Sequence, residues 1–166
     1  MERPTPDFLE ILKVLSRHKV DFIVVGGICA VLHGAPVTTF DLDLVYSRSQ
    51  SNLGHLMLAL EELEAYYRGR GIQRLKPGLA HLSSSGHHLL TTKFGPLDLL
   101  GTIGVGHTYN DLLKYTIVLK VGRLQLHVLK LETLIEIKKE TISEKDKIII
   151  AILERTLQAK QKSSKP

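Results

Sequence analysis

The chain has 166 residues, of which 43% are hydrophobic, and a formal net charge of +5. This length and composition predict one domain with a real core and exclude a disordered chain. The lone Cys29 excludes a disulfide scaffold, and no run approaches the roughly 18 apolar residues of a membrane span. Because the N-terminal residues also lack an apolar leader, we expect a cytoplasmic protein with no membrane partner.

Positive charge gathers in the C-terminal part of the chain. Residues 1–119 hold 11 basic and 11 acidic side chains, whereas residues 120–166 hold 11 basic and 6 acidic ones. Such a face could attract RNA or a polyphosphate. A solvated helix surface followed by a Lys-rich tail is the simpler interpretation.

The first 66 residues are predicted to alternate between helices and strands. In order, these are a helix from Thr5, a strand at 21–25, a helix at 28–33, a strand at 40–46 and a helix at 49–66. The triplet Thr5-Pro6-Asp7 suits a helix start, because Thr can cap, Pro fits the first turn and Asp favours the positive end. One face of the last helix carries Leu53, Leu56, Leu60 and Leu63.

The rest of the chain is predicted to contain mainly strands and then two helices. After an irregular stretch at 67–87, strands are expected at 87–94, 97–101, 115–121 and 124–130, with turns at Gly95-Pro96 and Gly122-Arg123, and helices at 130–140 and 144–160. This order predicts an α+β fold, with a mixed β-sheet flanked by helices. We expect a core domain at 1–130, a C-terminal helical segment at 131–160 packed on it, and a disordered tail at 161–166.

Three carboxylates are the first candidate site. Asp41 and Asp43 lie two apart on a strand, so both face the same way, roughly 6–7 Å apart. Asp98 lies inside an apolar strand, where a carboxylate is costly unless it is paired or bound to a metal. A hard cation such as Mg²⁺ or Mn²⁺ would relieve this repulsion, and such a set suits phosphoryl or nucleotidyl transfer. The structural alternatives are that Asp41 and Asp43 lie on an exposed strand face, and that Asp98 is paired with a nearby Lys or His.

The second candidate site is Gly26-Gly27, between a predicted strand and a helix. Bare backbone lets a phosphate approach closely, and the helix N-terminus offers free N–H groups. The spacing is neither that of a dinucleotide-binding Gly-x-Gly-x-x-Gly nor that of a Walker loop. The pair could instead form an ordinary turn.

These motifs together resemble a known superfamily. Val25-Gly26-Gly27 followed by Asp41-Leu42-Asp43-Leu44 resembles the signature of the DNA-polymerase-β-like nucleotidyltransferases. The wider sequence is similar to small bacterial members, which include the toxins of AbiE-type toxin–antitoxin pairs. Leu97-Asp98-Leu99-Leu100 resembles their third carboxylate strand. The segment 132–138, followed by Lys145-Asp146, resembles their C-terminal Leu-Ile-x-x-Lys…Lys-Asp segment.

The resemblance covers residues 18–155 and implies a polymerase-β-like fold and a nucleotidyltransferase activity. It implies that Asp41 and Asp43 hold divalent metals, while Asp98 helps to bind one and activates the acceptor hydroxyl. This hydroxyl would attack the α-phosphate of a nucleoside triphosphate (NTP), and pyrophosphate would leave. The acceptor could be RNA, tRNA, a protein or a small molecule.

The resemblance also implies the residues that grip the nucleotide. Gly26 and Gly27 would hold the β- and γ-phosphates, Lys138 could reach the triphosphate, and Thr39 could offer a hydroxyl near the metals. Thr39 could equally be a strand former, and Lys138 a solvated helix residue. The alternative function is a catalytically weak nucleotide-binding module of a toxin–antitoxin-like pair, with an antitoxin-like partner.

Several weaker signals have two interpretations. Lys145-Asp146 could be functional, or Ser143 could cap the last helix with Asp146 at its third position. The basic residues of one loop could grip a triphosphate or an RNA backbone, or face solvent: Arg68, Arg70, Arg74 and Lys76. Cys29 is predicted to be core, and His33 to make a structural hydrogen bond.

Overall fold

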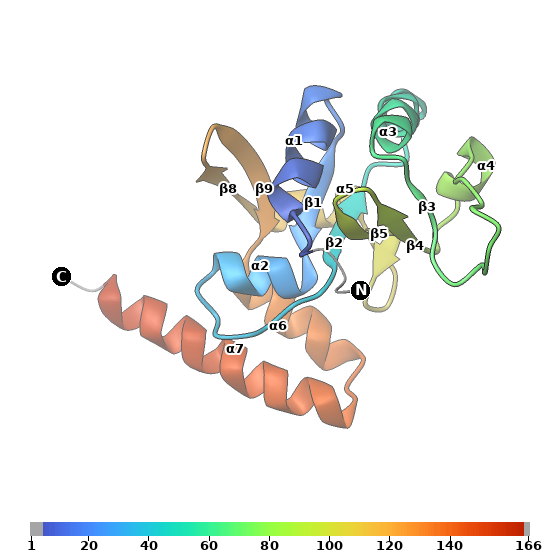
Figure 1. Cartoon of the computed structure of the whole chain (residues 1–166). Coiled ribbons are helices and arrows are strands. Elements are labelled where there is room, and N and C mark those ends of the chain that lie inside the picture. Colours follow the sequence, from blue (N-terminus) through green and yellow to red (C-terminus); the bar gives the residue numbers. More distant parts are fainter. Residues whose placement is uncertain (1–4, 165–166) are drawn as a thin grey trace.

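The computed structural model describes residues 5–164, and a mixed seven-stranded β-sheet forms its centre (Figure 1). Across the sheet the strands are β3 (Tyr66–Tyr67), β4 (His87–Thr92), β5 (Gly95–Leu100), β2 (Leu42–Tyr46), β1 (Phe22–Val25), β9 (Leu124–Leu129) and β8 (Thr116–Val121). The pairs β2–β5 and β1–β9 are parallel, and the other neighbours are antiparallel. The predicted mixed sheet is confirmed.

Helices flank this sheet as predicted. They are α1 (Phe8–Arg17), α2 (Gly26–Leu32), α3 (Gln50–Glu62), α6 (Leu131–Glu140) and α7 (Glu144–Ser163), with the short α4 (Leu79–Leu82) and α5 (Tyr109–Leu112). In Figure 1, α1 and α3 lie together at the top, whereas α6 and α7 lie together at the bottom, with α2 against α6. The fold is therefore α+β, and none of the described helices is both long and apolar enough to cross a membrane.

The apolar periodicity of the sequence predicts the buried faces well. Ile11, Leu12 and Leu15 of α1 are buried, and so is the predicted leucine stripe of α3. The start of α1 is one correction: Asp7, and not Thr5, caps the helix, and its carboxylate accepts the Glu10 N–H at 3.2 Å. The second helix begins directly at Gly26 instead of residue 28.

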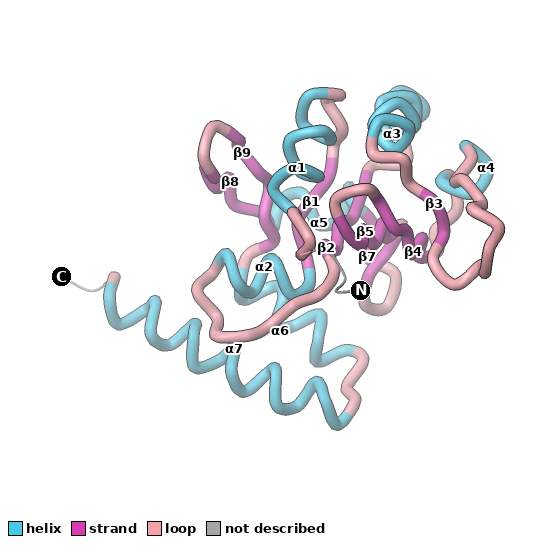
Figure 2. The backbone as a smooth tube through the Cα atoms, in the orientation of Figure 1, coloured by secondary structure: helices cyan, strands magenta, loops and turns pink. Residues whose placement is uncertain are grey.

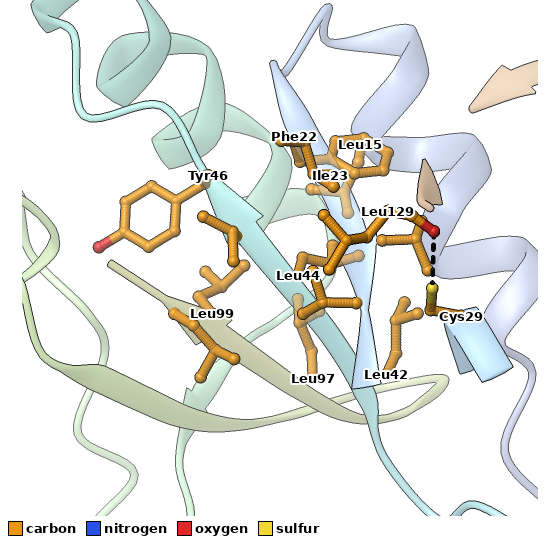
Figure 3. Close-up of a cluster of buried hydrophobic side chains, with 14 of the residues drawn as sticks. Leu15, Phe22, Ile23, Cys29, Leu42, Leu44, Tyr46, Leu97, Leu99 and Leu129 are labelled. Carbon is orange, nitrogen blue, oxygen red and sulfur yellow. Dashed lines mark hydrogen bonds between the residues drawn. The ribbon is translucent and has the colours of Figure 1, made fainter. Parts of the chain in front are cut away.

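Alternating side chains of the central strands form the core. Leu42 and Leu44 of β2 face Leu97 and Leu99 of β5 in one buried cluster (Figure 3). Cys29 joins this cluster as predicted, and its thiol donates to the Leu129 carbonyl at 3.2 Å (dashed in Figure 3). Burial raises the pKa of the Cys29 thiol to about 12, so the thiolate is disfavoured.

Several predicted boundaries are wrong in the middle of the chain. Gly95-Pro96 is not a turn but the start of β5. Thr92 and Gly95 form the last pair of the hairpin, so the chain reverses between these two residues. The Thr92 hydroxyl donates to the Gly95 carbonyl at 2.8 Å and accepts the Phe94 N–H at 3.1 Å. The small sheet of β6 (Thr102–Ile103) and β7 (His107–Thr108) was not predicted. Its strands are too short to show alternation.

The last helix extends further than its sequence suggests. It runs to Ser163, into the segment 161–166 that was expected to be disordered, while residues 165–166 lie outside the described residues. Lys160 Nζ donates to His33 Nδ1 at 2.8 Å, and His33 Nε2 donates to the Leu129 carbonyl at 2.8 Å. The predicted structural role of His33 is thereby confirmed. The division at residue 130 stays a prediction.

Candidate active site

Asp43 and Asp98 lie side by side on the two central strands β2 and β5. They are direct register partners in this parallel pair, so their side chains share one face of the sheet. The leucines on either side of each aspartate point into the core on the opposite face. Asp41 lies immediately before β2, since the strand predicted from residue 40 begins at Leu42.

Burial and mutual repulsion perturb this pair of carboxyl groups. Burial raises the pKa of Asp43 to about 7, and the charge of Asp98, a hydrogen bond with Asp98 and the charge of Asp41 add to the effect. Burial also raises the pKa of Asp98, although the Arg68 guanidinium opposes this rise. Burial therefore favours the protonated form of both carboxyl groups, and the neighbouring acids add to this effect at Asp43.

Arg68 is the main site residue that the sequence did not assign. It follows β3, and its Nη1 donates to Asp41 Oδ1 at 3.3 Å while its Nη2 donates to Asp98 Oδ1. The guanidinium thus links two of the three predicted carboxylates. Its place in the basic loop was the only available signal, because the contact depends on the pairing of β3, β4 and β5.

Gly26 and Gly27 lie directly against the carboxylate cluster. Gly26 has φ +65°, and a Cβ on it would collide with the carboxyl group of Asp43. A Cβ on Gly27 would lie 2.5 Å from Thr39 Oγ1, and this hydroxyl donates to the Asp41 carbonyl at 3.0 Å. The structure therefore brings both glycines and Thr39 to the carboxylates.

Two C-terminal lysines lie in different surroundings. Lys138 of α6 is half-buried, and its positive charge lowers the pKa of Asp43, so it belongs to the same electrostatic site. Lys145 is exposed in the first turn of α7, next to Asp146. Asp146 accepts the Ser143 N–H at 3.0 Å, and Ser143 Oγ accepts the Asp146 N–H at 3.3 Å. The capping interpretation of Ser143 and Asp146 is confirmed.

The donor set fits a hard divalent cation, but one oxygen each of Asp41 and Asp98 is engaged. Within residues 5–164, no three His, Cys, Asp or Glu side chains are arranged to hold a metal ion between them. Asp41 and Asp98 contact the Arg68 guanidinium instead. Carboxylate oxygens are the ligands that Mg²⁺ and Mn²⁺ prefer, and burial, followed by the charges of Asp98 and Asp41, raises the pKa of Asp43. Asp41, Asp43 and Asp98 are thus the residues that would hold such an ion.

The fold is shared with three solved structures. No family model and no curated protein matches the chain. A candidate nucleotidyltransferase from Thermotoga maritima aligns with 97% of this chain and 92% of its own, at 19% identity and TM-score 0.52. The lincosamide antibiotic adenylyltransferase LnuA, with lincomycin bound, aligns over 89% and 94% of the two chains, at 12% identity and TM-score 0.59.

The third structure is the enzyme ANT(2")-Ia in complex with adenylyl-2"-tobramycin. It aligns over 93% of this chain and 89% of its own, at 14% identity and TM-score 0.52. At these identities the likeness concerns the fold. The chain therefore has the nucleotidyltransferase fold that its sequence motifs predicted.

Proposed function

We propose that this chain is a metal-dependent nucleotidyltransferase, which moves a nucleoside monophosphate from an NTP to a hydroxyl acceptor and releases pyrophosphate. The observation that carries the proposal is the register pairing of Asp43 with Asp98 beside the bare backbone of Gly26. A buried pair of acids is costly to stability. It is explained simply if positive charge enters the site with the substrate.

Each residue has a role in this proposal. Asp41, Asp43 and Asp98 would hold Mg²⁺ or Mn²⁺, and such an ion would supply positive charge for the phosphates and orient them. Asp98 accepts the proton of the acceptor hydroxyl as its oxygen bonds to the α-phosphorus and the bond to the β-phosphate oxygen breaks. Pyrophosphate leaves with that electron pair.

The remaining residues would bind the nucleotide. The N–H groups of Gly26 and Gly27 would bind the β- and γ-phosphates, and Thr39 would offer a hydroxyl near the metals. Lys138 supplies a point charge for the triphosphate, consistent with its effect on the pKa of Asp43.

A small hydroxyl-bearing molecule is the acceptor class that the comparisons favour. Two of the structures that share this fold contain lincomycin and adenylylated tobramycin, which are both compact and rich in hydroxyl groups. RNA, tRNA or a protein are the other acceptors that we propose to test. An AbiE-type toxin role, with an antitoxin partner, is a narrower form of the same proposal and rests on the sequence motifs. The reaction would take place in the cytoplasm, where NTPs are found.

The decisive experiment is transfer of label from α-labelled NTPs. Each NTP is incubated with Mg²⁺ or Mn²⁺ and with tRNA, total RNA, cell extract, lincomycin or tobramycin. We expect label in one acceptor, and its loss with Asp43→Asn. If every NTP binds but no acceptor is labelled, the chain is the nucleotide-binding module of the alternative. If no NTP binds with either metal, the proposal is wrong.

A further inference from the structure

Arg68 lies directly after β3 and begins a row of residues that runs across β4, β5 and β2 on one face of the sheet. Its N–H donates to the Leu89 carbonyl at 2.9 Å, Leu89 pairs with Asp98, and Asp98 pairs with Asp43. Directly paired residues project on the same face, so the open face carries Leu89, Asp98 and Asp43 in line. Arg68 and Asp98 lie two strand spacings apart, about 10 Å, and the Arg68 side chain crosses β4 to reach the acids.

The guanidinium occupies one oxygen of each of two carboxylates that a metal would need. It contacts Oδ1 of Asp41 and Oδ1 of Asp98, two carboxylates that no backbone pairing joins. The planar fork of an arginine suits such a bridge better than a lysine does. A divalent cation in the same place would repel it strongly, because both are positive and the surroundings are partly buried.

The surroundings leave room for the guanidinium to move. The Arg68 side chain is 28% exposed, whereas that of Asp98 is only 12% exposed. Arg68 is followed by Gly69 and Gly71, both at positive φ, and residues 69–76 are all exposed. This loop runs between β3 and α4 without secondary structure (Figure 2). Water is therefore within reach of the side chain once it leaves the acids.

We propose that Arg68 is an exchangeable cation of the metal site: it holds Asp41 and Asp98 before the metal binds, and it must release them when the metal arrives. This inference rests on the proposed function, since it assumes that a divalent metal binds these carboxylates. Only the fraction of molecules with Arg68 released is competent to bind. The apparent metal affinity of the wild type is lowered by that fraction.

Titration of the nucleotide-free protein with Mn²⁺ in a calorimeter tests the proposal. Arg68→Ala is expected to bind Mn²⁺ roughly tenfold tighter than the wild type, because the competing cation is gone. Arg70→Ala removes the same charge from the same loop without touching the bridge, and it should bind as the wild type does. Arg68→Lys keeps the charge but lacks the fork, and we expect an intermediate affinity.

Thermal unfolding supplies a second measurement, which needs no activity. In EDTA, Arg68→Ala should unfold at a lower temperature than the wild type, because two carboxylates lose their partner. Saturating Mn²⁺ should raise its melting temperature by more than that of the wild type. Arg68→Lys replaces the alanine variant in both measurements if that variant does not unfold cooperatively.

The outcomes separate the two proposals. If the wild type binds Mn²⁺ and Arg68→Ala binds it no tighter, the exchange is wrong and the metal site stands. The exchange is equally wrong if Arg70→Ala gains as much affinity as Arg68→Ala, since the effect is then one of general charge. If neither the wild type nor Arg68→Ala binds Mn²⁺, the metal-dependent function fails, and the exchange with it.

Discussion

Two aspartates that the sequence offers as candidate site residues, Asp43 and Asp146, differ in their surroundings. Asp43 is packed against Asp98, and burial together with neighbouring charge raises its pKa to about 7. Asp146 stands at the exposed start of α7, where hydrogen bonds from Ser143 lower its pKa. One carboxyl group is costly to the fold and the other stabilises it. An acid that is electrostatically costly to the fold therefore marks a candidate site, whereas an acid that stabilises the fold marks a helix cap.

The largest expected effect comes from removing the costly acid. Asp43→Asn should lower the transfer rate by roughly 10³-fold, because the metals lose a ligand. At pH 8 it should also raise the melting temperature of the metal-free protein, since one of two adjacent buried charges is gone. Label transfer and thermal unfolding in EDTA measure both effects.

The matched control is Asp146→Asn, for which the effect on rate should vanish and the change in melting temperature should reverse. It should leave the rate unaltered and lower the melting temperature, because a neutral amide is a weaker cap acceptor than a carboxylate. Equal losses of rate in the two variants would remove the distinction between the two aspartates.

The pH dependence of stability in the metal-free protein tests the raised pKa of Asp43. Protonated Asp43 contributes stability that is complete below its ordinary pKa of 3.8 and is lost as the pH rises to about 7. The free energy of unfolding of the wild type, minus that of Asp43→Asn, should therefore fall between pH 4 and 7 and level off above. Urea denaturation in EDTA measures this difference. A flat difference would contradict the assigned protonation.

Two lysines near these acids should differ in a smaller way. Lys138→Ala is expected to raise the KM for the NTP about fivefold, or ~1 kcal/mol, because a charge beside the site is lost. Lys145→Ala should leave KM unchanged, since this side chain is exposed at the start of α7. Steady-state kinetics on the two variants decides which part of the Lys…Lys-Asp segment acts on the nucleotide.

The smallest effect should come from the cap itself. Ser143→Ala is expected to lower the free energy of unfolding by roughly 1 kcal/mol and leave the transfer rate unchanged. The double variant Ser143→Ala/Asp146→Asn should lose less free energy of unfolding than the two single variants lose together. The reason is that each residue hydrogen-bonds the backbone of the other. Chemical denaturation measures the free energies of unfolding. A clear loss of transfer rate in Ser143→Ala would mean that the cap has a role in function.

Local patterns in the sequence predict much of this fold. The leucine stripe of α3, the buried Cys29 and the cap at Ser143 all depend on neighbours within a few residues or on burial alone. The alternation around Asp43 also predicts that it faces away from the neighbouring leucines, whereas Asp98 was predicted only as an acid inside an apolar strand. What joins them is the parallel pairing of β2 with β5, which spacing along the chain does not specify.

Arg68 shows where such prediction ends. Its contacts with Asp41 and Asp98 depend on two successive strand pairings, β3 with β4 and β4 with β5. A one-residue slip in either would send its side chain to the other face. The turn misplaced at Gly95-Pro96 has the same cause, because the hairpin register, and not the glycine, fixes where the chain reverses.

The close approach of Gly26 to Asp43 has a consequence for the order in which substrates enter. The backbone proposed to cradle phosphates already touches a carboxylate, so two anions would share one small volume. A bare triphosphate arriving there would meet repulsion, whereas a triphosphate escorted by its own divalent ion would not. We therefore expect the metal–nucleotide complex to be the species that docks, and chelation to weaken nucleotide binding as well as turnover.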